Sequence, residues 1–172
     1  MAGLPMGAAG HWAAMRFRVS LLASLVGLCL SSAVFGKDSL GVYGDWGAFR
    51  DPGNTRCYAI AEPDATSGGR PFASVAYWPG KGIRTQFQVR LGAAAQSAVV
   101  AIDGQRFRLV TGGNNGWAAD KRMDAAIVAA LRNATAMRVE SRSVSGGLLV
   151  DLYRTKGAAS AIDAAALGCV RR

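Results

Sequence analysis

Few side chains of this sequence are suited to catalysis, and carboxylates are the most numerous of them. The chain holds 11 Asp and Glu, three Cys and a single His, which is His11. Because His11 precedes the segment that we expect to fold, a histidine general base, a Ser–His or Cys–His pair and an imidazole metal site are all excluded there. No nucleophile elbow, phosphate loop or dinucleotide fingerprint occurs. The sequence therefore indicates a protein that is not an enzyme and that uses no metal or cofactor.

A pair of carboxylates is the one catalytic arrangement left open, since a glycoside hydrolase needs only two such groups close together. Asp45 and Asp51 flank an early predicted strand, and Asp120 and Asp124 lie at the start of a predicted helix. We interpret the second pair as helix-capping residues and Asp45 as a turn residue, because Asp favours these positions. A carboxylate-based hydrolase of envelope glycan is kept as an alternative function.

Aromatic and basic residues offer a binding surface. Trp78 lies just before a Pro-Gly turn, and Trp117 follows the glycine-rich segment 111–116, so both are near loop ends, where recognition residues are common. Core packing of these tryptophans is the structural alternative. Four arginines on the polar sides of predicted strands complete the candidate surface, with a solvated outer face as their alternative role: Arg84, Arg90, Arg106 and Arg108.

The first 36 residues have the layout of a secretory signal peptide. A basic start at 16–18 precedes an apolar run at 21–30, and small residues follow it. Cleavage is expected after Gly36, with Ala33 as the second choice. The run is too short for a comfortable membrane span, which disfavours a retained anchor. Acylation of Cys29 is disfavoured by the bulky leucine before it.

Removal of the leader would leave residues 37–172 as one domain in the periplasm, with the outer membrane or cell surface as further destinations. These 136 residues are a typical domain length and carry 18 basic and 11 acidic side chains, a net charge of +7. The expected partner is an envelope protein or an anionic envelope component. Dispersed charges argue against nucleic acid, and no membrane span is expected after cleavage. The sequence leaves the oligomeric state open.

Cys57 and Cys169 are the cysteines that remain after cleavage, 112 residues apart. In an oxidising compartment an even pair favours a disulfide, although unpaired thiols or a bond between two chains are the alternatives. Closing a loop of this length would stabilise the fold by about 4–5 kcal/mol in the chain-entropy model. Cys169 lies on the apolar stripe of the last predicted helix, which suits a bond to a strand.

Short strands separated by turns predict a mainly β fold, an antiparallel β-sandwich with one internal helix and a C-terminal helix. Segment 84–91 alternates apolar and polar residues, as in a half-buried strand, and Asp103-Gly104 supplies a tight hairpin turn. The predicted strands are 42–49, 57–61, 72–78, 84–91, 98–102, 106–110, 137–142 and 148–154, and the predicted helices are 120–133 and 158–168.

Two short motifs resemble the invasion-associated locus B family. Gly44-Asp45-Trp46 comes soon after the leader, with Cys57 one strand later, and the chain closes with a strand at 148–153 and a helix of small residues opening at 157–162. The order of elements is similar over most of 41–169. Members usually place a cysteine very soon after the tryptophan, where this chain has 49–51, so the family's disulfide pattern is not carried over.

The resemblance implies an exported protein of the Gram-negative periplasm or cell surface, with a β-sandwich fold. The family is linked to host-cell entry in some pathogens and has no established enzymatic activity. From the resemblance and the residues together we expect a non-enzymatic envelope protein that acts as a binding or interaction module. A purely structural or assembly protein is the remaining alternative.

Overall fold

The computed structural model describes residues 36–170, and the expected signal peptide lies outside them. In this part of the chain ten strands form one antiparallel sheet, in the order β1-β2-β3-β4-β5-β8-β7-β6-β9-β10. The predicted mainly antiparallel β class with an internal and a C-terminal helix is confirmed. The strands are β1 (Asp38–Tyr43), β2 (Trp46–Asp51), β3 (Arg56–Ala61), β4 (Phe72–Trp78), β5 (Ile83–Arg90), β6 (Ala95–Ile102), β7 (Gln105–Gly112), β8 (Asn115–Trp117), β9 (Ala136–Ser143) and β10 (Leu148–Arg154).

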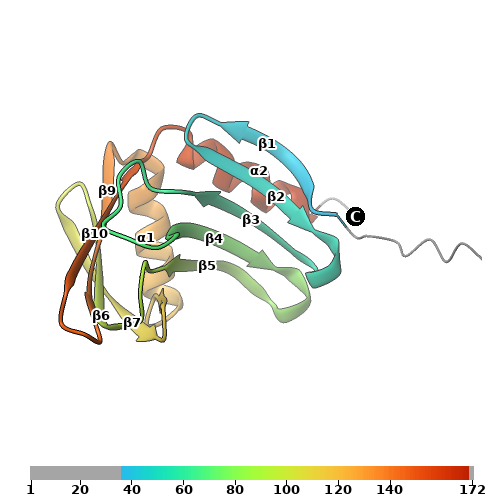
Figure 1. The fold of residues 1–172 in the computed structure, drawn as a ribbon. Helices are drawn as coiled ribbons and strands as arrows, with labels where there is room; N and C mark the ends of the chain where they lie inside the picture. The colour runs from blue at the N-terminus through green and yellow to red at the C-terminus, as the bar shows by residue number, and fades with distance from the viewer. Residues whose placement is uncertain (1–35, 171–172) are drawn as a thin grey trace, which may run out of the picture. The chain divides into compact units, whose positions relative to one another are not determined.

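The strands are hydrogen-bonded into one bent sheet. The sequence had instead predicted two sheets packed as a sandwich. Figure 1 shows β6, β7, β9 and β10 running steeply across the direction of β1–β5. The three-residue strand β8 joins the two halves by pairing with both β5 and β7. Because neighbouring strands rotate by about 20–25° relative to one another, ten strands accumulate a large turn. In place of a second sheet, two helices cover the apolar face.

Helices α1 (Lys121–Asn133) and α2 (Ala158–Val170) pack on the same face of the sheet, α2 against β1–β4 and α1 against β5 and β6 (Figure 1). The side chain of Asp120 accepts a hydrogen bond from Met123 N at 2.8 Å, so the predicted N-cap of α1 is confirmed. The apolar stripe of α1 is buried, and small side chains let α2 approach the strands closely. These buried residues are Ile127, Val128, Leu131, Ala158, Ala161, Ile162 and Ala165.

The first predicted strand, 42–49, is in fact a hairpin of two strands. β1 and β2 pair from Asp38↔Arg50 to Tyr43↔Trp46, with the turn at Gly44 and Asp45. Gly44 has a φ of +63°, and a Cβ there would press against the carbonyl oxygen of Lys156. Gly44-Asp45 separates the apolar residues on its two sides, and this dipeptide is a hairpin signal that the predicted single strand overlooks.

The structure confirms the predicted hairpin turn at 103–104 and corrects the prediction of a loop at 111–116. Asp103 and Gly104 take φ values of +43° and +87° and join β6 to β7, which confirms the predicted hairpin. The glycine-rich segment 111–116 was predicted as a loop, but most of it continues β7 and forms β8. Gly113, with φ +58°, lies in the tight turn between them.

The segment 62–71 closes the bent sheet by crossing to β10. Ala65 pairs with Leu152 in an isolated bridge, and the Ser67 side chain both donates to Val150 O and accepts from Val150 N. The Thr66 hydroxyl donates to Asp151 Oδ1 at 2.6 Å. Asp151 is 1% exposed, and this burial raises the pKa of its carboxyl.

Trp46 anchors the start of β2 to the end of β10. Its side chain is fully buried, and the indole N–H donates to Arg154 O at 3.0 Å. The Gly-Asp-Trp motif therefore has a structural role in this fold, since it makes the tight turn and then fastens the two halves of the sheet. Neither helix of the described residues has the length and apolar character of a membrane span.

Candidate functional site

The disulfide between Cys57 and Cys169 is present, with 5.7 Å between the two Cα atoms. Cys57 lies on the helix-covered face of β3 and is fully buried, and Cys169 lies near the end of α2. The helical spacing that directed Cys169 toward the sheet predicted this geometry. The bond fixes the last turn of α2 onto the sheet.

Trp78 and Trp117 lie on the opposite side, on what we call the open face: the face of β1–β5 and β8 that is turned away from both helices. The Trp78 indole N–H donates to Gln86 Oε1 at 3.2 Å. Gln88, two residues further along β5 and therefore on the same face, is paired directly with Trp117 of β8. Both tryptophans are partly exposed, so neither is a core residue.

The two tryptophans are separated by two strand spacings and about four residues along β5, or roughly 17 Å from ordinary strand dimensions. The amides of Gln86 and Gln88 occupy the interval between them. The open face thus presents two aromatic side chains with amide groups in between, which is a surface suited to an extended ligand.

The four predicted arginines are all exposed, but the structure does not bring them into one patch. Arg90 ends β5, and Arg108 lies two strands away on β7. Arg106 is already paired with Glu140, with a nitrogen–oxygen distance of 2.7 Å. Arg84 lies at the other end of β5, beside a hollow that Asp120 and Asp124 also line.

A different set of cations gathers at the open face. Arg56 of β3 lies between two rings, with its Cζ 4.6 Å from the Tyr58 centroid and 5.3 Å from the Trp78 centroid. Lys81 Nζ lies 4.6 Å from the Trp78 centroid, and Lys37 Nζ lies 6.0 Å from that of Tyr58. These distances are typical of cation–π contacts. We call this alternating row the cation–aromatic ladder: Lys37, Tyr58, Arg56, Trp78 and Lys81.

Sequence reasoning missed most of the ladder, although one signal for it was available. Arg56-Cys57-Tyr58 lie on one strand, so burial of the central cysteine places its two neighbours together on the opposite face. Trp78 was identified from its loop position. Lys81 lies in the short 3-10 turn Pro79–Lys81 that follows β4, and only the folded turn brings it back over Trp78.

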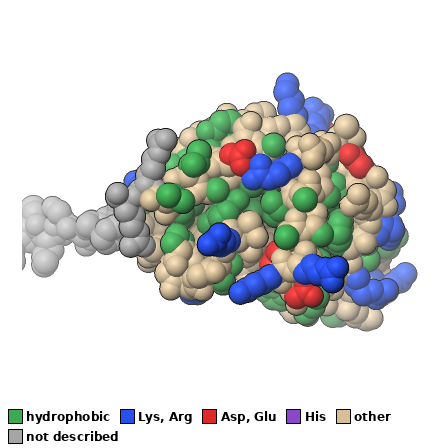
Figure 2. All heavy atoms as spheres, turned by 180° about the vertical axis from the view of Figure 1, so that it is seen from behind, with side chains coloured by type: hydrophobic (Ala, Val, Ile, Leu, Met, Phe, Trp, Pro, Cys, Tyr) green, Lys and Arg blue, Asp and Glu red, His purple; other side chains and the backbone are tan. Residues whose placement is uncertain are grey.

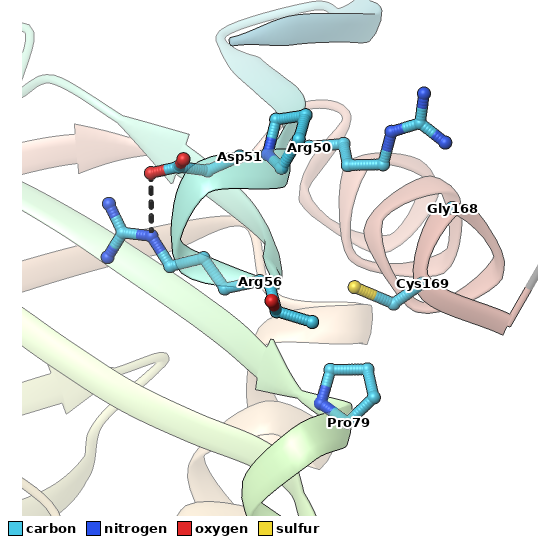
Figure 3. Close-up of a pocket in the computed structure, with 8 residues that line it drawn as sticks. Arg50, Asp51, Arg56, Pro79, Gly168 and Cys169 are labelled. Atoms are coloured by element: carbon cyan, nitrogen blue, oxygen red, sulfur yellow. Dashed lines mark ion pairs between the residues drawn. The ribbon is translucent and has the colours of Figure 1, made fainter. Parts of the chain in front are cut away.

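A hollow of 380 Å³ borders the ladder near the end of α2. Figure 3 shows Arg56 on one side of it, directed toward Asp51, with Pro79 and Cys169 on the other. Arg56 Nε is buried without a hydrogen-bond partner and lies 3.6 Å from Asp51 Oδ2. Hydrogen bonds from Asn54 lower the pKa of Asp51, and the charges of Arg56 and Lys37 act in the same direction.

The candidate catalytic carboxylates have structural partners. Asp120 caps α1, and Asp124 Oδ1 accepts from Phe87 N at 2.7 Å, which ties α1 to β5. Burial raises the pKa of Asp124, and the nearby charge of Asp120 adds to this. Asp51 Oδ1 accepts from Asn54 N at the short turn after β2. The capping interpretation is therefore correct for Asp120, whereas Asp124 makes a tertiary contact that sequence reasoning missed.

The helix-covered side differs from the open face in its chemistry. Figure 2 shows that side, where apolar side chains alternate with separate Lys and Arg side chains and with a few carboxylates. Arg132 of α1 pairs with Asp163 of α2 at 2.6 Å, which holds the two helices together.

Comparisons of the chain with protein-family models, with curated proteins and with solved structures found no match.

Proposed function

We propose that this chain is an exported, non-enzymatic binding module of the Gram-negative envelope, of the invasion-associated locus B type. The observation that carries this proposal is the open face, which neither α1 nor α2 covers and which presents partly exposed aromatic side chains beside cations. Exposed aromatic side chains bring a large contact area at a small entropic cost, which makes them effective in recognition. The +7 charge of residues 37–172 supports an anionic component as partner.

The carboxylates give less support to the hydrolase alternative. Oxygens of both Asp120 and Asp124 accept backbone N–H groups, which suits residues that fix the position of α1. A glycosidase pair instead directs one protonated and one ionised carboxyl at a bond between them. The disulfide supports export, because such bonds persist in oxidising compartments.

Export is tested by expressing the full chain in a Gram-negative host and taking the intact mass of the periplasmic product. We expect a species that begins at or near Lys37 and that is lighter than its reduced form by the two hydrogens of one disulfide. An uncleaved, cytoplasmic product with free thiols would overturn the assignment to the envelope.

Binding is tested by sedimenting the purified protein with isolated envelopes of the host. The double variant Trp78→Ala/Trp117→Ala should lose most of its bound fraction. The matched control Leu167→Ala/Val170→Ala removes two exposed apolar side chains from α2, which are 56% and 78% exposed, and should bind as the wild type does. Equal binding by both variants would contradict the proposed surface. Release of reducing sugars would favour the hydrolase, and a tight dimer that buries Trp78 or Trp117 would favour the assembly role.

A further inference from the structure

The cationic side chains of the cation–aromatic ladder lie over aromatic rings, and carboxylates neutralise little of their positive charge. Arg56 has Asp51 nearby, at 3.6 Å, but hydrogen bonds from Asn54 already engage both oxygens of that carboxylate. Among the residues that the structure describes, Lys37 and Lys81 have no carboxylate within 4 Å. The row therefore keeps an excess of positive charge that an external anion could neutralise.

The geometry of the ladder fixes where these charges lie. Tyr58 and Trp78 are on neighbouring strands, and Arg56 contacts both rings, so its guanidinium cannot swing freely as an ordinary surface arginine does. A guanidinium that is already ordered loses little further entropy when it binds a carboxylate or a similar planar anion. Lys37 and Lys81 continue the row at either end, so the ladder holds several charges along a line and suits an anion with repeated charges.

The surroundings of the ladder extend this line in two directions. The 380 Å³ hollow lies at its Arg56 side, where Arg56 Nε is buried without a hydrogen-bond partner. On the other side Gln86 uses its side-chain oxygen to accept from Trp78, which leaves its NH₂ group for hydroxyl acceptors of a ligand. Charged groups would thus bind at the ladder, and neutral hydroxyls would bind along β5.

Two other classes of anion fit these features less well. Binding of single-stranded nucleic acid relies on bases that stack on free aromatic faces, and here the rings of Tyr58 and Trp78 already carry cations. Membrane binding needs apolar side chains that enter the lipid. Within residues 36–170, the large apolar side chains that are clearly exposed all lie outside the ladder: Val42, Val110, Val144, Leu148, Leu152, Leu167 and Val170.

We propose that the cation–aromatic ladder binds an anionic polysaccharide, with carboxylate groups of successive sugars at Lys37, Arg56 and Lys81 and sugar hydroxyls at Gln86. This inference rests on the proposed binding function and names its ligand class. Since Lys37 and Lys81 are exposed, binding should weaken as salt increases.

The test measures the Kd of polygalacturonate for the purified protein by titration calorimetry, with uncharged dextran as the control polymer. Lys37→Ala/Lys81→Ala removes two charges from the ladder and should weaken polygalacturonate binding at least tenfold. Arg122→Ala/Arg142→Ala removes two charges from exposed positions on α1 and β9, away from the ladder and Gln86, and should change the Kd less than twofold. A third variant, Arg56→Gln, removes the central charge of the ladder. Thermal melts of the wild type and of the three variants check that each protein is folded.

Several outcomes would overturn the inference. Equal weakening by the two double variants would show a nonspecific response to net charge, and equal binding of dextran would remove the role of the cations. Tighter binding to anionic lipid vesicles or to single-stranded DNA would assign the ladder to a different ligand class. If polygalacturonate fails while tryptophan-dependent envelope binding persists, the ligand class is wrong and the binding function stands. If both fail, both proposals fall.

Discussion

Removal of the disulfide between Cys57 and Cys169 should destabilise this protein by an amount that its loop length sets. The bond closes a loop of 112 residues. In the chain-entropy model such a loop restricts the unfolded chain by roughly 16 cal/mol/K, which corresponds to about 4.8 kcal/mol at 25 °C. With an unfolding entropy of about 2.1 cal/mol/K per residue, the 136 residues from 37 to 172 should melt roughly 17 °C lower.

The assay is urea unfolding of the oxidised protein, the reduced protein and the Cys57→Ala/Cys169→Ala variant. The reduced protein keeps both sulfur atoms, so its difference from the oxidised form isolates the cross-link. The double variant adds the loss of packing at Cys57, which is fully buried. Because the cross-link also limits how far the unfolded chain expands, its removal should raise the m-value.

The reduced protein decides whether this entropic effect of the cross-link operates. A reduced protein that retains its native circular dichroism and lies within 1 kcal/mol of the oxidised form would refute it. Such a result would mean that the reduced, unfolded chain already retains structure that keeps residues 57 and 169 near each other. A large loss with an unchanged m-value would place the effect in the native state instead.

Three further perturbations test other features of the fold. Gly157→Ala should destabilise far more than Gly146→Ala, because φ is near +90° at both positions but only at 157 would a Cβ collide with the Tyr43 carbonyl oxygen; equal melting temperatures would contradict this. Hydrogen bonds from the backbone and side chain of Thr135 lower the pKa of Asp103. The stabilisation of the fold by this carboxylate is therefore present above the ordinary pKa of 3.8 and is lost as pH falls through the folded pKa. Asp103→Asn should therefore flatten the acid limb of a stability–pH curve, and an unchanged limb would refute the linkage. Burial raises the pKa of Asp151, so stability falls as pH rises from 3.8 through its folded pKa. Compared with the wild type, Asp151→Asn should therefore increase the free energy of unfolding more at pH 7 than at pH 3. A decrease in that free energy at both pH values would show that losing the hydrogen bond from Thr66 outweighs removal of the charge.

Most helices and strands of this fold could be predicted from the sequence, because the patterns that indicate them involve only neighbouring residues. The alternation at 84–91, the Asp103-Gly104 turn and the Asp120 cap each depend on a few neighbouring residues, and the structure confirms all three. The strands at 72–78 and 148–154 also match the prediction. The reversal at Gly44 was missed although Gly44-Asp45, between two short apolar segments, is itself a local hairpin signal.

Part of the candidate site was also readable from the chain. Trp78 and Trp117 could be identified by their positions at strand ends, and Cys169 by its helical spacing. The grouping of the four arginines could not be judged, since it depends on strand order: β8 separates β5 from β7, and Glu140 of β9 reaches Arg106. The ladder likewise needs β3 and β4 as neighbours and the turn after β4 to return Lys81 over a ring.

The sequence by itself determined the secondary structure class and the absence of histidine from residues 37–172, because composition and short-range periodicity decide these properties. It favoured a disulfide between Cys57 and Cys169, but only the fold, which brings the two cysteines together, decided that pairing. Only the tertiary structure decided that ten strands bend into one sheet, with helices in place of a second layer, and that cations and rings alternate on its open face. The physical reason is that strand order and sheet curvature come from contacts between residues far apart in the chain. Such contacts leave no pattern in the local sequence.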